Sequence, residues 1–171
     1  LLDMMSLRER FEKLQGLNIA IVGDIIHSRV ALSNIYGLQK MGANVTLCGP
    51  PHLIPKGICE LGVSVNSDID EVIEWADALN ILRIQKERMG VGIIPSIREY
   101  RDFFGITQDR LENHKKEIVI MHPGPMNRGV EIDSSVADGD QAIILNQVLN
   151  GVAIRMSILY LLLGPDGGIE N

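Results

Sequence analysis

The stretch LNIAIVGD, residues 17–24, is an apolar run that ends at Gly-Asp. Strands that are buried on both faces of a parallel sheet have this composition. A helical pattern follows over residues 29–41 and stops at Gly42, and a second apolar run, ANVTLCGP at 43–50, ends in turn residues. Because a strand, a helix and a strand come in succession, the sequence predicts an α/β fold with right-handed connections.

The same alternation continues along the chain. The further predicted elements are a short helix near 55–61, a strand at 63–65, a helix at 68–76 capped by Ser67 or Asp68, a strand at 77–85, a helix at 107–115 capped by Thr107, and a strand at 117–121. We therefore expect a Rossmann-like, three-layer α/β domain with a mostly parallel sheet of about five strands. The segment 86–105 lacks a regular pattern and contains glycines, so we expect a long loop that is functional or mobile.

Both ends of the sequence carry apolar helical patterns. Residues 1–15 place apolar side chains at helical spacing before Gly16, and residues 138–163 form a long apolar pattern that is followed by a polar tail, 164–171. Each pattern is apolar over more of its surface than one small sheet can cover, so we expect both helices to pack against a neighbouring domain. The sequence starts at Leu1, inside a helical pattern and without an initiator Met, which indicates a fragment.

Composition narrows the class of protein. The chain has 171 residues, of which 46% are hydrophobic and 22% charged, as is typical of one globular domain. A net charge of -6 argues against a nucleic-acid partner. No run of 18 apolar residues and no leader pattern are present, so we expect neither a membrane span nor secretion. Cys48 and Cys59 lack the spacing of a metal site or a disulfide framework, which favours a cytoplasmic protein without a metal.

The first candidate binding segment is GDIIHSR, residues 23–29, after the first predicted strand. Ser28 can cap the next helix and place Arg29 in its first turn, where a helix N-terminus and a guanidinium together would bind an anion. In the alternative interpretation, Arg29 points to solvent or pairs with Asp24. The glycine pattern of a dinucleotide-binding fold and that of a phosphate loop are both absent.

The second candidate segment is LRIQKERM, residues 82–89, after the fourth predicted strand. Residues two apart in an extended segment face the same side, so Arg83 and Gln85 are expected to project together. Arginine offers two parallel donors to a carboxylate, and glutamine offers both a donor and an acceptor. The pair suits an amino-acid ligand better than a phosphate. The alternative is a solvated charged turn, because residues 86–88 are also charged.

The third candidate segment is MHPGPMNRG, residues 121–129, after the fifth predicted strand. Pro123 and Pro125 flank Gly124, stiffen the loop and lack amide donors. Carbonyl groups in such a loop are left to accept hydrogen bonds from an amine or an amide. His122 either orients the loop or is a structural histidine, and a turn without a function is the alternative for the whole segment.

Taken together, these segments resemble the aspartate carbamoyltransferase family. The resemblance rests on an ordered set of motifs: GDIxHSR with Ser33 and Asn34 downstream, RIQKERM, HPGPMNRGVEI, and ILNQVxNGVAxRM at 144–156. It extends from Leu1 to about Leu163. It implies transfer of a carbamoyl group from carbamoyl phosphate to the α-amine of L-aspartate, in pyrimidine biosynthesis and without a cofactor. Ornithine carbamoyltransferase, the nearest alternative, would carry H-C-L-P and S-M-G motifs, which are absent here.

The resemblance also implies roles for the residues of the three segments. The residues that match the family's ligands for the aspartate carboxylates are Arg29, Arg83 and Gln85. The carbonyl groups of Pro123 and Gly124 match acceptors for the amine and the carbamoyl NH2, with His122 beside them. The bond before Pro125 is expected to be cis, and the 86–105 loop is expected to close over bound aspartate.

The resemblance further implies that a second half of the enzyme exists. The phosphate-binding motif SxRTR is absent, and none of the family's catalytic residues can be assigned here. We expect interdomain helices at 1–16 and 138–163 around an aspartate-binding domain at 17–137. The expected partners are the carbamoyl-phosphate half, without which the chain would be inactive, and further copies in a homotrimer; the resemblance is also compatible with a dihydroorotase or a regulatory subunit. A non-catalytic interaction module is the competing interpretation.

Overall fold

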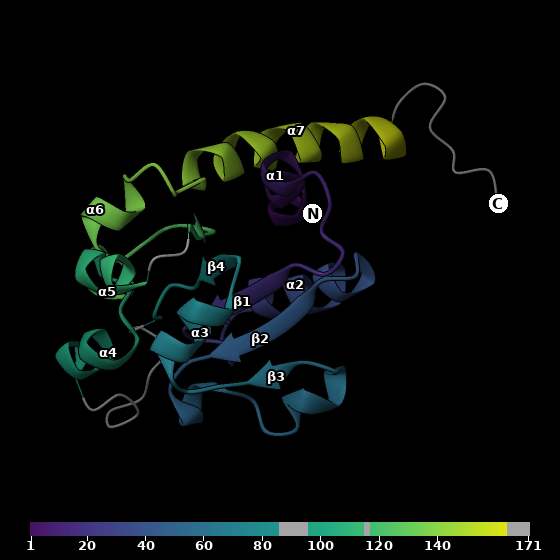
Figure 1. Ribbon diagram of the computed structural model, residues 1–171. Helices are drawn as coiled ribbons and strands as arrows, with labels where there is room; N and C mark the ends of the chain where they lie inside the picture. Colours follow the sequence, from purple (N-terminus) through teal and green to yellow (C-terminus); the bar gives the residue numbers. More distant parts are fainter. Residues whose placement is uncertain (86–95, 115–116, 164–171) are drawn as a thin grey trace.

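The computed structural model describes residues 1–85, 96–114 and 117–163. Five strands form a single sheet in the order β3-β2-β1-β4-β5, and each neighbouring pair is parallel (Figure 1). The strands are β1 (Asn18–Val22), β2 (Asn44–Cys48), β3 (Ser64–Val65), β4 (Ala78–Ile81) and β5 (Val119–Met121). The predicted α/β fold with a five-stranded parallel sheet is confirmed.

Helices cover both faces of this sheet (Figure 1). They are α1 (Leu2–Phe11), α2 (Arg29–Lys40), α3 (Ile69–Trp75), α4 (Ile97–Phe104), α5 (Gln108–Asn113), α6 (Ser134–Ala137) and α7 (Ile144–Leu163), with short 3-10 turns η1 (Pro51–Leu53) and η2 (Ile58–Leu61). In β1, Ile19 and Ile21 pack with α1 and α2, whereas Ala20 and Val22 pack with α3. This alternation buries both faces of the strand and produces the three layers.

Polar side chains cap the helices where the sequence predicts them. The Ser28 hydroxyl accepts a hydrogen bond from the Ala31 amide at 3.1 Å, and the Thr107 hydroxyl accepts one from the Arg110 amide at 3.2 Å. Of the two predicted caps for α3, Asp68 is the one in place. Each cap satisfies an amide that has no partner within its helix.

The two end helices are shorter than predicted. Helix α1 ends at Phe11, because Glu12 adopts a positive φ of 64° and the chain turns toward β1. Helix α7 begins at Ile144, not near residue 138. The segment before it is extended along the free edge of β5, where the Ile120 amide donates to the Gln141 carbonyl at 2.9 Å. Sheet hydrogen bonding therefore overrides the helical pattern over these residues.

A helix stands in part of the segment that was expected to be irregular. Helix α4 covers Ile97–Phe104, and the Ser96 hydroxyl caps it by accepting from the Glu99 amide at 2.9 Å. Ser96 and Glu99 have the Ser-x-x-Glu spacing that marks a helix start, which could have revealed α4 from the sequence. Residues 86–95 of the loop at 86–105 that was expected to close lie outside the described residues.

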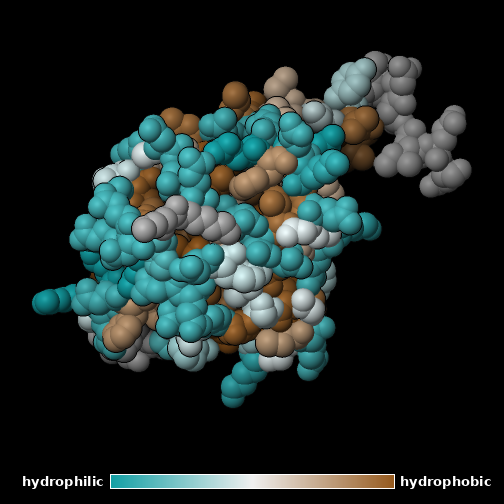
Figure 2. All heavy atoms as spheres, viewed as in Figure 1, coloured by the Kyte–Doolittle hydropathy of each residue, from teal (hydrophilic) through white to brown (hydrophobic). Residues whose placement is uncertain are grey.

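Helix α7 carries a large exposed apolar face. Figure 2 shows apolar side chains along the edge of the molecule where α7 lies. The most exposed are Leu145, Val148, Leu149, Met156, Tyr160, Leu161 and Leu163. By length and composition alone, α7 could also cross a membrane, contrary to the expectation from the sequence. This is weak evidence for a span, because helices that pack inside proteins pass the same test.

Candidate functional site

The strand order places a switch point between β1 and β4. From β1 the chain builds outward through β2 to β3, and it then returns to the other side of β1 to form β4 and β5. Ligands of open parallel sheets bind outside the carboxyl ends of the strands at such a point. The three candidate segments of the sequence follow β1, β4 and β5, so they line this one edge.

The segment after β1 turns sharply under close backbone packing. Gly23 has a φ of 122°, and a Cβ atom there would lie 2.9 Å from the Leu82 carbonyl oxygen. The Asp24 carboxylate is fully buried and binds the His27 ring, with its oxygens 2.9 and 3.0 Å from Nδ1. Asp24 therefore holds His27, while Arg29 begins α2 and its side chain is exposed to solvent.

The segment after β4 is bound to the loops on both of its sides. The Gln85 side-chain amide donates to the His27 carbonyl at 3.0 Å, which joins the ends of β4 and β1. The Asn127 side-chain amide donates to the Ile84 carbonyl at 3.2 Å, which joins the ends of β4 and β5. Ile84 is buried, while Arg83 and Gln85 on either side of it are half-buried. This alternation agrees with the prediction that Arg83 and Gln85 project to one side.

The segment after β5 is organised by His122, which is buried. Its Nδ1 accepts a hydrogen bond from the Gly124 amide at 2.9 Å, so the ring proton of the neutral imidazole must sit on Nε2. Nε2 lies 3.4 Å from a Glu131 carboxylate oxygen, without the geometry of a hydrogen bond. The Gly124–Pro125 peptide bond is cis, as predicted, and Gly124 has a φ of 63°.

Two buried or half-buried residues of this loop were not predicted from the sequence. Glu131 is fully buried and accepts hydrogen bonds from the backbone amide and the side chain of Asn127. Asn127 in turn reaches the carbonyl of Ile84. Both residues belong to the quoted HPGPMNRGVEI motif, but only the folded chain shows that they connect the ends of β4 and β5.

The structure thus brings the predicted site residues to one edge of the sheet. Gln85 and His122 are held by hydrogen bonds to neighbouring segments, whereas Gly124 and Pro125 are exposed at the tip of their loop. Among the described residues, no hydrogen bond occupies the carbonyl oxygens of Pro123 or Gly124. These two acceptors are therefore available to a ligand.

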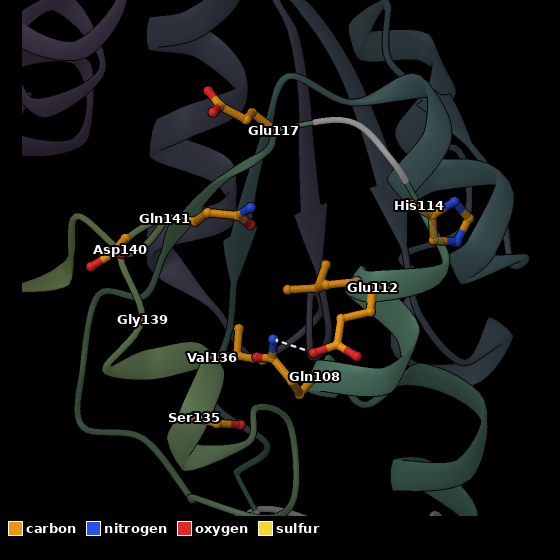
Figure 3. Close-up of a pocket in the computed structure, with 10 residues that line it drawn as sticks. Gln108, Glu112, His114, Glu117, Ser135, Val136, Gly139, Asp140 and Gln141 are labelled. Atoms are coloured by element: carbon orange, nitrogen blue, oxygen red, sulfur yellow. Dashed lines mark hydrogen bonds between the residues drawn. The ribbon is translucent and has the colours of Figure 1, made fainter.

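A separate pocket, of about 370 Å³, lies beside α5, α6 and the start of β5 (Figure 3). Its rim carries the carboxylates of Glu112, Glu117 and Asp140, and Gln108 donates to Glu112 at 2.9 Å. Like charges disfavour a dicarboxylate ligand here. Glu117 also precedes β5, so this pocket is distinct from the edge at which the three segments meet.

Two buried titratable side chains, Tyr100 and Cys48, lie next to the segment that follows β1. The Tyr100 hydroxyl has no hydrogen-bond partner among the described residues, and a Cβ atom on Gly23 would lie 3.3 Å from it. Burial raises the pKa of Tyr100 well above its usual value, and the negative charge of Glu131 adds to the effect. Burial, and then the charge of Asp68, raise the pKa of the Cys48 thiol to about 12.

These environments predict different reactivities for the two thiols. Because the thiolate is the reactive form, we expect exposed Cys59 to react rapidly with a disulfide reagent at pH 8 and buried Cys48 to react only after unfolding. The measurement is the number of thiols titrated before and after denaturant is added. In the Cys59→Ser variant, the rapid phase is expected to disappear. A rapid phase that persists in this variant would show that Cys48 is accessible.

A doubly wound parallel sheet with cationic and amide groups at its switch point defines an α/β ligand-binding domain. Residues 15–162 match the family described as aspartate/ornithine carbamoyltransferase, Asp/Orn binding domain. This match covers most of the chain, and the chain belongs to that family.

Individual relatives agree with this assignment. The chain is 60% identical over 164 residues to the aspartate carbamoyltransferase catalytic subunit of Gemmatimonas aurantiaca, covering 96% of the chain and 51% of the relative. It is 57% identical to that of Halothermothrix orenii, covering 100% of the chain and 55% of the relative. The chain therefore spans about half the length of these curated relatives.

Solved structures share the fold. The catalytic subunit of M. jannaschii aspartate transcarbamoylase matches with a TM-score of 0.77 and 31% identity, covering 98% of this chain and 55% of that one. Ornithine carbamoyltransferase from Pyrococcus furiosus matches with a TM-score of 0.79 over 96% of this chain and 55% of that one, but at only 22% identity. The second likeness is one of fold alone.

Proposed function

We propose that this chain is the aspartate-binding half of an aspartate carbamoyltransferase. The complete enzyme would transfer the carbamoyl group of carbamoyl phosphate to L-aspartate, giving N-carbamoyl-L-aspartate and phosphate, as a cytoplasmic step of de novo pyrimidine biosynthesis. The convergence of the segments carrying Arg29, Arg83, Gln85 and the His122–Pro125 loop at one sheet edge is the observation that carries this proposal. The curated relatives, named as catalytic subunits of this enzyme, support it.

Each proposed contact uses ordinary chemistry of its side chain. Arg29 and Arg83 offer paired donors to the two carboxylates of aspartate, and Gln85 adds an amide donor. The free carbonyls of Pro123 and Gly124 would accept hydrogen bonds from the amine and the carbamoyl NH2. His122 would act on the substrate only through the loop, because its Nδ1 holds the Gly124 amide.

The reaction is an attack by the neutral α-amine on the carbamoyl carbon. The amine nitrogen forms the new bond to carbon, the bond from carbon to the phosphate oxygen breaks, and phosphate leaves with the electron pair while the amine loses a proton. Because the chemistry is direct transfer, catalysis would rest on positioning and on stabilisation of the tetrahedral oxyanion. This chain would supply the positioning of aspartate.

The remaining contributions would come from a carbamoyl-phosphate-binding half. The exposed apolar face of α7 would be covered in the complete enzyme, since apolar surfaces of this extent mark interaction sites. We propose that residues 1–16 and 138–163 connect to that half, that residues 17–137 form the aspartate-binding domain, and that the enzyme is a homotrimer. The chain alone would then be inactive.

The decisive experiment is an assay of carbamoyl transfer with this chain alone and with its carbamoyl-phosphate half added. We expect activity with L-aspartate only in the mixture, and no activity when L-ornithine replaces it. Activity with ornithine instead would reassign the substrate. If a mixture that is folded and assembled is inactive with both amino acids, the chain is a non-catalytic interaction module.

A further inference from the structure

A buried carboxylate on α1 lies outside the three candidate segments. Asp3, on α1, is only 4% exposed. Its Oδ2 accepts hydrogen bonds from the side-chain amides of Asn34 at 2.6 Å and Asn80 at 3.3 Å, and its Oδ1 accepts one from the Gln147 side-chain amide at 2.7 Å. A charge that is buried to this degree is retained at a cost unless its hydrogen bonds are satisfied, and here several amides satisfy them.

Two of the three amide donors belong to elements that lead to the proposed aspartate contacts. Asn34 lies on α2, the helix that begins with Arg29, and Asn80 lies in β4, which leads to Arg83. Gln147 lies on α7 and extends the hydrogen bonds of Asp3 to the loop that follows β5.

Hydrogen bonds connect Gln147 to the loop at His122–Pro125. The Oε1 atom of Gln147 accepts the backbone amide of His122 at 2.9 Å, and His122 Nδ1 accepts the amide of Gly124. Beyond it, Nε2 of His122 faces Glu131, which holds Asn127, and Asn127 holds the carbonyl of Ile84. One polar chain thus runs from α1 through α7 to the loops that follow β5 and β4.

We propose that Asp3 and Gln147 are positioning residues for the aspartate site, which together fix the loop at His122–Pro125 relative to α2 and β4. This inference rests on the proposed function. Gln147 is well suited to the role because its amide donates on one side and accepts on the other, so its orientation is set by Asp3. Asp3 lies on α1, next to α7, so the packing of these two helices is linked to the geometry of the loop.

Helix α7 also contains a matched control. Asn150 is buried like Gln147, and its side-chain amide donates to Ser6 at 3.0 Å and Glu9 at 2.7 Å, both on α1. It therefore also bonds α7 to α1. Its hydrogen bonds do not reach the loop after β5, whereas those of Gln147 do.

The experiment compares Gln147→Met with Asn150→Leu in the complete enzyme, each a replacement of similar size. Gln147→Met is expected to raise the KM for L-aspartate about tenfold or more while the KM for carbamoyl phosphate stays within about twofold. Asn150→Leu is expected to lower the melting temperature to a similar degree and to leave both KM values within about twofold. Equal rises in the aspartate KM for the two variants, or none for Gln147→Met, would overturn the proposal.

If Gln147→Met does not fold, a second pair of variants tests whether Asp3 and Gln147 position the loop. Gln147→Glu places a second carboxylate against Asp3 and is expected to raise the aspartate KM about tenfold. Adding Asp3→Asn restores a donor between the two side chains, keeps the acceptor for His122 and returns the total charge to its original value. The double variant is expected to recover an aspartate KM within about threefold of the wild type.

The outcomes separate this inference from the proposed function. A double variant no better than Gln147→Glu would overturn the positioning role of Asp3 and Gln147. A wild-type complete enzyme that does not carbamoylate aspartate would instead refute the proposed function, before any variant is compared.

Discussion

Replacing Arg83 by methionine in the complete enzyme is expected to lower kcat/KM for L-aspartate by about a hundredfold to a thousandfold, the usual effect of removing one partner from a desolvated charge pair. Arg83 follows β4 beside the buried Ile84 and is half-buried, so water could replace its contacts to a carboxylate only in part. The KM for carbamoyl phosphate is expected to be unchanged. The measurement is steady-state kinetics with aspartate varied at saturating carbamoyl phosphate.

Arg98→Met is the matched control for this variant. Arg98 lies on α4, its side chain is 91% exposed, and its ion pair with Asp102 spans 3.9 Å. Exposed pairs of this kind contribute little, so kcat/KM is expected to stay within about twofold of the wild type. A loss of similar size in both variants would mean that Arg83 does not hold the substrate. Arg83→Lys, which keeps the charge but not the planar pair of donors, is expected to be intermediate.

Replacing Gly23 by alanine is expected to destabilise the folded state by about 3 to 5 kcal/mol, as the sum of strained backbone and overpacking. Gly23 combines a φ of 122° with a Cβ position 2.9 Å from the Leu82 carbonyl, and the backbone on which it sits is also packed against Gly49. Neither neighbour is the end of a flexible side chain that could move away. Any shift of Leu82 would also displace Arg83.

Gly16→Ala separates the cost of backbone strain from the cost of overpacking. Gly16 has a φ of 81°, but a Cβ atom there meets nothing within 4 Å. Its replacement carries only the cost of the left-handed conformation, about 1 to 2 kcal/mol. The measurement is the denaturant midpoint of each variant. Equal losses for Gly16→Ala and Gly23→Ala would show that the close approach to Leu82 adds nothing.

The sheet could be predicted from the sequence because its determinants are local. The apolar run of β1 and the caps at Ser28 and Thr107 each depend on neighbouring residues, and all were placed correctly. The start of α7 could not be predicted, because the residues before it pair with β5, which is distant in the sequence. The helix α4 was missed within a segment judged by its glycines, although its capping residues gave a local signal.

In the candidate site, too, features with local determinants could be predicted, whereas contacts between distant segments could not. The motifs with Arg29, Arg83 and the Pro-Gly-Pro loop could be assigned to strand ends, and topology then brings those ends together. The hydrogen bonds from Gln85 to the His27 carbonyl and from the His122 amide to Gln147 join segments that are distant in the sequence. A single sequence contains no periodicity that reports such contacts. The roles of these residues toward aspartate stay predictions until the variants are measured.

Helix α1 shows where this domain can be divided. A dissection guided by the match to the family, which begins at residue 15, would keep every strand and yet delete Asp3. The side-chain amides of Asn34, Asn80 and Gln147 would then lose the acceptor that they share inside the protein. A unit that keeps these three hydrogen bonds therefore starts before the sheet, at the first turn of α1.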